Sequence, residues 1–205
     1  GDWIGFLDDD DILYPWHFAV FAKELASKRD KLFFYSNHNR SLFSQVGDDS
    51  PFLSTAVNPW NYSKKELWIS NRIPIHTWLV RKACFNQTGL FDETQQMLED
   101  FEFLVRLSEI TDFTHINVVT CEYRYYLDGS NSMMFQREKV FEALNVIYQK
   151  HPSRDKYIQD KRNTELEVVK KEVERIATLR KTLSGDFQKD EAILTKMISI
   201  ILGFQ

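Results

Sequence analysis

The stretch that decides the fold is Trp3-Ile-Gly-Phe-Leu7, which runs directly into the four aspartates Asp8-Asp9-Asp10-Asp11. A short apolar run that ends in polar residues is typical of a buried strand that feeds a loop at its carboxyl end. Open α/β sheets bind ligands at this end of their strands. Neighbouring carboxylates repel one another unless a cation offsets their charge, and oxygen ligands suit Mg²⁺ or Mn²⁺. The acidic turn is therefore either a metal site or a solvated loop.

The residues after this turn predict a helix and a second strand. Pro15 stands where the first turn of a helix tolerates proline, and apolar residues follow at helical spacing over residues 16–28. Residues 31–36 (KLFFYS) are typical of the next strand. Strand, helix and strand in this order form a βαβ unit, which favours a mostly parallel sheet. Residues 37–70 are predicted to form a loop, because a glycine and two prolines interrupt them.

Three further elements complete the predicted α/β part. Residues 75–80 are predicted to form a strand, and residues 99–110 a helix with an acidic first turn. Residues 113–126 are rich in Thr, Val, Tyr and Ile, which predicts one or two strands. We therefore expect an α/β domain over residues 1–134.

From residue 135 onward the pattern becomes helical. Apolar residues fall near heptad spacing over residues 156–183, and a second amphipathic stretch over residues 191–202 follows the helix stop Ser184-Gly185-Asp186. These two stretches predict a C-terminal helical hairpin within a helical extension over residues 135–205. The hairpin would either pack back on the domain or serve as a dimerisation arm.

The composition is that of an ordinary globular chain. Apolar residues make up 43% of the 205 residues and charged residues 27%, which is enough for a packed core. The formal net charge of −4 argues against a nucleic-acid surface, but a nucleotide ligand remains compatible with it because a divalent cation can supply positive charge. Cys84 and Cys121 lack zinc-site spacing and are predicted to be buried thiols in a reducing compartment. No stretch approaches the about 18 apolar residues of a membrane span, and no signal peptide opens the chain.

A second acidic site lies in Leu98-Glu99-Asp100-Phe101-Glu102, ahead of which stands the turn Gly89-Leu90-Phe91-Asp92-Glu93. Carboxylates in the first turn of a helix interact favourably with the helix dipole, so a capping role alone would account for them. Whether these carboxylates have a chemical role depends on whether the acidic turn after the first strand is a metal site or a solvated loop.

Four motifs, taken in their order along the chain, resemble glycosyltransferase family 2 with the GT-A fold. They are FLDDDD-I-L-x-P, IHTWLVRK, G-L-F-D-E and ED-x-E-x-L-x-R-L. The resemblance runs from Trp3 to about Met134. It implies a partial GT-A-like mixed sheet flanked by helices, without the N-terminal half that binds the nucleotide. The buried strand that opens the chain at Trp3 needs neighbours on both sides, so we expect the chain to be incomplete.

The resemblance implies roles for both acidic sites. Asp10 is the expected metal ligand with Asp8 as its partner, and Asp9 and Asp11 are available to the ribose or the cation. The cofactor is a divalent cation, Mn²⁺ or Mg²⁺, which acts as a Lewis acid on the departing nucleoside diphosphate. Asp100 is the expected general base that deprotonates the acceptor hydroxyl as it attacks the anomeric carbon, with inversion of configuration.

Four more residues receive roles on the same basis. Glu99, His76 and Trp78 are expected on the acceptor side, and Arg124 near the donor diphosphate. His76 and Trp78 are single residues on a predicted strand, where a structural role is the competing interpretation. The resemblance also implies the partners: a nucleotide-sugar donor and a carbohydrate or lipid-linked acceptor. Assembly of a bacterial surface polysaccharide at the cytoplasmic face of a membrane, with oligomerisation through the C-terminal helices and peripheral membrane contact, is the setting that we expect.

Two other classes of protein compete with this interpretation. Asp8-x-Asp10 after a strand also imitates the first motif of haloacid-dehalogenase phosphatases, and Gly185-Asp186 with Asp190 imitates their last motif. That last motif must follow an apolar strand, whereas here it follows a helix rich in Lys and Glu. The second alternative is a catalytically incomplete transferase-like domain that binds a partner through its helical tail. The presence of both acidic pairs argues against it, because a binding module has no use for both.

Overall fold

The computed structural model describes residues 1–43, 51, 53–57, 63–126 and 136–182. The chain forms two compact units, which are described separately. The first comprises Gly1–Ser41 and Ser54–Arg124, and the second the described residues of Leu42–Leu53 and Tyr125–Gln205. The predicted division at residue 134 lies outside the described residues.

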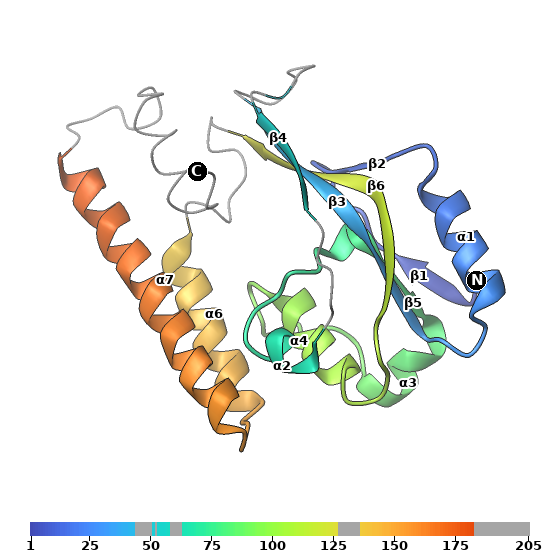
Figure 1. Cartoon of the computed structure of the whole chain (residues 1–205). Helices are drawn as coiled ribbons and strands as arrows, with labels where there is room; N and C mark the ends of the chain where they lie inside the picture. Colours follow the sequence, from blue (N-terminus) through green and yellow to red (C-terminus); the bar gives the residue numbers. More distant parts are fainter. Residues whose placement is uncertain (44–50, 52, 58–62, 127–135, 183–205) are drawn as a thin grey trace. The chain divides into compact units, whose positions relative to one another are not determined.

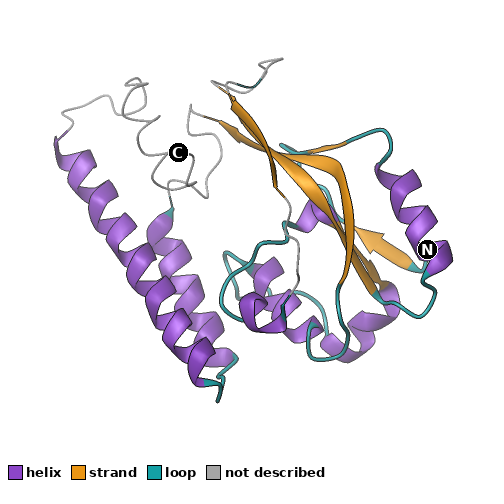
Figure 2. Ribbon diagram, viewed as in Figure 1, coloured by secondary structure: helices purple, strands orange, loops and turns teal. Residues whose placement is uncertain are grey.

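A six-stranded sheet forms the centre of the first unit, and the ends of three of its strands belong to the second (Figures 1 and 2). Its path is β1-β5-β3-β6-β2, and β4 pairs with β3 off this path. The strands are β1 (Trp3–Gly5), β2 (Ile12–Leu13), β3 (Phe33–Phe43), β4 (Leu53–Val57), β5 (Trp78–Arg81) and β6 (Thr114–Tyr126). Together with the flanking helices the sheet gives the α/β class with a partial mixed sheet that the sequence predicts.

Strand β5 lies between β1 and β3 and pairs antiparallel with both, with Trp3 opposite Arg81 and Phe33 opposite Val80. Because β1 and β3 are each antiparallel to β5, they run in the same direction, as the strand–helix–strand pattern predicts. They are not neighbours, however, and β2 and β6 are also antiparallel. The prediction of a mostly parallel sheet is therefore wrong for these pairs. The cause is a strand from far along the chain, which no local pattern at β1 reveals.

The helices of the first unit are α1 (His17–Ser27), α2 (Lys64–Leu67), α3 (Phe85–Thr88) and α4 (Glu99–Leu107), with 3₁₀ turns η1 (Ile75–Thr77) and η2 (Lys82–Cys84). Helices α1 and α4 confirm the predicted helices, α4 being three residues shorter. The strand predicted at residues 75–80 begins only at Trp78, because the residues before it form η1 after Pro74.

The prediction of a loop over residues 37–70 is wrong in part. Strand β3 continues to Phe43, and β4 and α2 also lie within this stretch. Ser36, Asn37, His38 and Ser41 are buried although they are polar. The strand therefore lacks the alternation of apolar and polar residues that identifies a strand in a sequence.

The core of the first unit is built around Trp78, which is 1% exposed. Its ring stacks on Phe103 of α4 at 6.0 Å and lies 5.3 Å from Phe33 and 5.1 Å from Phe6. A Cβ atom at Gly5 would lie 2.6 Å from a methyl group of Leu79, its partner across the β1–β5 pair, so the Leu79 side chain packs directly on this glycine. These contacts fix β1, and with it the start of the acidic turn, against β5.

The described helices of the second unit are α6 (Arg137–Lys150) and α7 (Lys156–Thr182), which pack along each other (Figure 1). Arg137 of α6 forms an ion pair with Glu172 of α7, and Arg162 lies over the ring of Tyr148 at 4.5 Å. Helix α7 confirms the helix predicted from residue 156. Its predicted partner at residues 191–202 lies outside the described residues, and the observed helix pair is α6 and α7. Among the described helices, none has both the length and the apolar character to span a membrane.

Candidate functional site

The acidic turn follows β1 and leads into β2. The Asp11 backbone N–H donates to the Asp8 carbonyl at 3.3 Å, which closes the turn at Asp9 and Asp10. Partial desolvation, followed by the charge of Asp11, raises the pKa of both Asp8 and Asp10. Further repulsion comes from within the turn, because Asp9 raises the pKa of both side chains. The turn therefore concentrates negative charge where a cation would be stabilised.

The second acidic site begins at an unusual backbone conformation. Leu98 has φ = 61°, the left-handed region, which costs a non-glycine residue about 1–2 kcal/mol. The Leu98 carbonyl nevertheless accepts the Glu102 N–H at 3.0 Å and so opens α4. Glu99 and Asp100 occupy the first turn of this helix. Surrounding contacts hold the chain in a strained turn directly before the two carboxylates.

Asp100 is held by two hydrogen bonds. Its Oδ2 atom accepts Nδ2 of Asn71 at 2.7 Å, and its Oδ1 atom accepts the Phe101 N–H at 2.7 Å. Burial raises the pKa of Asp100 to about 7, with further increases from the charges of Glu99 and Asp8. The hydrogen bonds from Phe101 and Asn71 lower the pKa and only partly offset this rise. Near neutral pH, Asp100 can therefore both hold and release a proton, as a general base requires.

The two acidic sites lie within electrostatic reach of each other. The charge of Asp8 raises the pKa of Asp100, and the charge of Glu99 raises the pKa of Asp8. Asp10 is perturbed instead by the other aspartates of its own turn. The structure thus brings Asp8 together with Glu99 and Asp100, although more than ninety positions separate them in the sequence. In the part of the chain that the structure describes, no three His, Cys, Asp or Glu side chains are grouped so that they could hold a metal ion.

Asp11 differs from the aspartates before it, because its side chain is buried. Its Oδ2 atom lies 2.7 Å from Nδ1 of His76, and its Oδ1 atom accepts the Arg124 backbone N–H at 2.9 Å. Burial alone would lower the pKa of His76, but the interactions of its ring with the neighbouring Asp11 and Cys121 side chains outweigh it and raise the pKa to about 9. This ion pair anchors the end of the acidic turn to η1 and β6.

Three other predicted site residues have partners within the protein. The indole of Trp78 packs in the core, and the His76 ring is 1% exposed and lies 5.4 Å from the ring of Tyr123. Nε of Arg124 donates to Oε1 of Glu122 at 2.7 Å. These contacts show how the Trp78 and His76 side chains are held within the protein, and their roles toward an acceptor stay predictions. Glu99 and Asp9, in contrast, are exposed.

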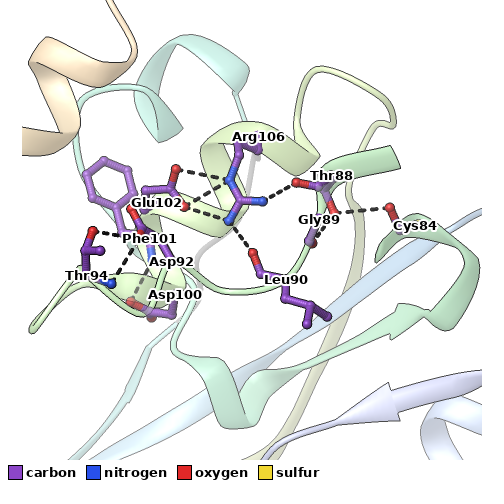
Figure 3. Close-up of polar contacts among 10 residues, drawn as sticks. All are labelled: Cys84, Thr88, Gly89, Leu90, Asp92, Thr94, Asp100, Phe101, Glu102 and Arg106. Atoms are coloured by element: carbon purple, nitrogen blue, oxygen red, sulfur yellow. Dashed lines mark hydrogen bonds and ion pairs between the residues drawn. The ribbon is translucent and has the colours of Figure 1, made fainter. Parts of the chain in front are cut away.

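The motif after the G-L-F-D-E turn contains a buried ion pair that the sequence reasoning missed (Figure 3). Oε2 of Glu102, whose side chain is 0% exposed, accepts Nε and Nη2 of Arg106 at 2.9 and 2.7 Å. The same guanidinium donates to the carbonyls of Thr88 and Leu90. Helix α4 is thereby fixed to the turn before it. The spacing of Glu102 and Arg106, four residues apart on one helix, was the available signal.

Asn71 is another residue that the sequence reasoning missed. It lies in a segment between α2 and η1, and nothing in its neighbourhood of the sequence points to Asp100, which is 29 positions away. No sequence signal would have identified it.

No protein-family model matches the chain. It is 24% identical over 115 residues to an uncharacterized glycosyltransferase of Haemophilus influenzae, an alignment that covers 56% of this chain and 38% of that protein. It is 27% identical over 149 residues to a chondroitin synthase of Escherichia coli, with coverage of 71% and 21%. It is 26% identical over 149 residues to a hyaluronan synthase of Pasteurella multocida, with coverage of 71% and 14%. The chain is thus similar to glycosyltransferases and spans well under half the length of each of these relatives.

Proposed function

We propose that this chain carries the catalytic residues of an inverting glycosyltransferase, which transfers a sugar from a nucleotide-sugar donor to a hydroxyl of a carbohydrate or lipid-linked acceptor. The observation that carries the proposal is the electrostatic interaction of Asp8 with Glu99 and Asp100, with the pKa of Asp100 raised to about 7 and its carboxylate held by Asn71 and the Phe101 N–H. Similarity to a glycosyltransferase and two polysaccharide synthases supports the reaction class. Polysaccharide assembly at the cytoplasmic face of a membrane is the setting that we propose by analogy.

Asp100 is the proposed general base. Its free carboxylate lone pair takes the proton of the acceptor hydroxyl, while the hydroxyl oxygen forms a bond to the anomeric carbon. The bond from that carbon to the diphosphate oxygen breaks in the same step, and the nucleoside diphosphate leaves with the electron pair. Attack from the face opposite the leaving group inverts the anomeric configuration. A base with a pKa near the working pH is suited to this step.

The acidic turn fits a divalent cation. Asp8 and Asp10 offer oxygen ligands, which suit Mg²⁺ and Mn²⁺, and desolvation followed by repulsion from Asp11 raises the pKa of both. When bound, the cation supplies Lewis-acid stabilisation of the departing diphosphate. In this proposal Asp8 and Asp10 would hold the ion, and the donor diphosphate and water would supply its other ligands.

The remaining predicted residues receive narrower roles in this proposal. Asp9 and Glu99 are exposed, and we propose that Asp9 faces the donor ribose and Glu99 the acceptor. The Asp11–His76 pair holds the acidic turn in position rather than contacting either substrate. Arg124 contributes its backbone N–H to Asp11, and we propose that its guanidinium approaches the diphosphate from beside Glu122.

The direct test is transfer by the complete gene product. It would be incubated with a panel of nucleotide sugars, oligosaccharide acceptors and Mn²⁺, and nucleoside diphosphate release and product mass would be measured. The proposal predicts transfer that stops on chelation and returns with Mn²⁺, and an anomeric configuration in the product opposite to that of the donor. Retention of configuration, or release that is insensitive to chelation, would contradict the mechanism.

A further inference from the structure

Asn71 contacts both the backbone of its own segment and Asp100. Its Oδ1 atom accepts the Ile73 backbone N–H at 2.9 Å, and its Nδ2 atom donates to Oδ2 of Asp100 at 2.7 Å. Only the oxygen end of an amide can accept a backbone N–H. The Ile73 contact therefore determines which end of the Asn71 amide faces Asp100, and that end is the donor.

The Asp100 carboxylate is consequently fixed at both oxygen atoms. Oδ2 receives Asn71, and Oδ1 receives the Phe101 N–H at the start of α4. The two donors come from different segments, so the carboxylate cannot rotate without losing one of them. A base that must meet a hydroxyl proton at a defined angle benefits from such pre-orientation.

We infer that Asn71 is a positioning residue for the proposed base, holding the Asp100 carboxylate in a fixed plane and in its ionised form. The inference rests on the proposed function. Three influences on Asp100 favour its protonated form: burial, Glu99 beside it on α4, and Asp8 on the acidic turn. The Phe101 N–H and Asn71 favour the ionised form. Of these two donors, the Phe101 N–H belongs to the backbone and the Asn71 amide to a side chain. A substitution can therefore remove the Asn71 donor and not the other.

The same segment also carries the contact to the other acidic site. His76 lies five positions after Asn71 and holds Asp11 at the end of the acidic turn. The stretch from Asn71 to His76 thus contacts Asp100 through Asn71 and the acidic turn through His76 of η1.

The decisive variant is Asn71→Asp. It retains an oxygen for the Ile73 N–H, so the segment keeps its fold, but it replaces the donor to Asp100 with a carboxylate. Asn71→Ala removes both contacts and serves as the second variant. Loss of a hydrogen bond to a charged group moves a carboxyl pKa by about one unit or more. In the complete gene product we expect the acid limb of the kcat–pH profile to move up by at least about one unit in both variants, while donor affinity is unchanged.

Asn86→Asp is the matched control, because it introduces the same charge at an exposed position of α3. The carboxyl ¹³C titration of Asp100 provides a readout that needs no activity. The pKa of Asp100 from this titration should be higher in Asn71→Ala than in the unmodified protein. In Asn71→Asp the carboxyl groups at positions 71 and 100 should titrate as a coupled pair. An acid limb and a carboxyl titration that both match those of Asn86→Asp would overturn the inference. If Asp100→Asn itself retains turnover, the proposed function fails; if only the Asn71 variants are unchanged, the inference about Asn71 fails alone.

Discussion

Nδ1 of His76 lies 2.7 Å from Oδ2 of Asp11, and both side chains are buried. This pair separates Asp11, which is buried, from the three aspartates before it, which are not. Asp11 is anchored inside the protein by His76 and by the Arg124 backbone N–H. The three aspartates before it form the exposed or half-buried part of the turn. The anchor determines where Asp8 and Asp10 lie relative to α4.

The first prediction concerns the pH dependence of stability that this pair produces. The pKa of His76 is raised from 6.5 to about 9 on folding, so the folded chain binds the proton more tightly than the unfolded chain. The stabilisation is fully present below pH 6.5 and is lost as the pH rises through 9, by an amount on the order of a few kcal/mol. Denaturant unfolding at pH 6, 7.5 and 9 should show this decline. In Asp11→Asn the decline should largely disappear, and parallel curves for the two proteins would show that the pair is not coupled as described.

The second prediction concerns Glu102. Removing one partner of a buried ion pair leaves the other uncompensated and typically costs about 3–5 kcal/mol. Glu102→Gln should therefore lower the free energy of unfolding substantially, because Arg106 also holds the carbonyls of Thr88 and Leu90. Glu109→Gln is the control: its pair with Lys64 is exposed on both sides and should contribute at most about 1 kcal/mol. Similar small losses in both variants would refute the anchoring role.

The third prediction concerns Asp100 and stability at acid to neutral pH. Its pKa is raised from 3.8 to about 7, so between these values the folded chain binds a proton that the unfolded chain does not. The free energy of unfolding should therefore fall as the pH rises from 4 to 7. Asp100→Asn cannot titrate and should remove this contribution, whereas Asp112→Asn, at an exposed position, should leave it intact. Urea denaturation at half-unit pH intervals measures both slopes, and an unchanged slope in Asp100→Asn would contradict the raised pKa.

The fourth prediction concerns the cation. Mn²⁺ should bind the complete gene product weakly alone and more tightly with a nucleoside diphosphate, since the diphosphate supplies ligands. Asp10→Asn should reduce this binding by at least about tenfold. Asp30→Asn, far from the turn in sequence and exposed, should not change it. Titration calorimetry with Mn²⁺ and the diphosphate measures this affinity. Equal Mn²⁺ affinities for the two variants would show that the acidic turn is a solvated loop and not a metal site.

Local patterns predicted the elements whose burial follows a simple period. Helix α4 was recognisable because five apolar residues of its nine are buried, and α7 because apolar residues recur near heptad spacing. The position of β5 between β1 and β3 could not be predicted, because it depends on pairing between distant segments. The polar residues that lengthen β3 are buried for tertiary reasons, and no period in the sequence records this.

The candidate site was predictable in its acidic residues and not in their partners. Asp8, Glu99 and Asp100 were named from motifs, and the structure places them within electrostatic reach of one another. Asp11 is chemically identical to its neighbours in the sequence, so its burial against His76 had no sequence signal. For Trp78 the competing structural interpretation fits the observed packing. Glu102, to which the sequence reasoning gave no role of its own, is buried and paired with Arg106.

The most direct test of the central claim is the kinetics of Asp100→Asn in the complete gene product, measured beside donor binding and with Asp112→Asn as the matched control. A general base acts mainly in the transition state, and its loss typically costs about 10²–10⁴ in rate. We predict that kcat collapses by this factor in Asp100→Asn while the Kd for the nucleotide-sugar donor stays nearly constant and Asp112→Asn behaves as the unmodified protein. Near-normal turnover in Asp100→Asn would contradict the account, and a joint loss of donor binding and thermal stability would assign Asp100 a structural role instead.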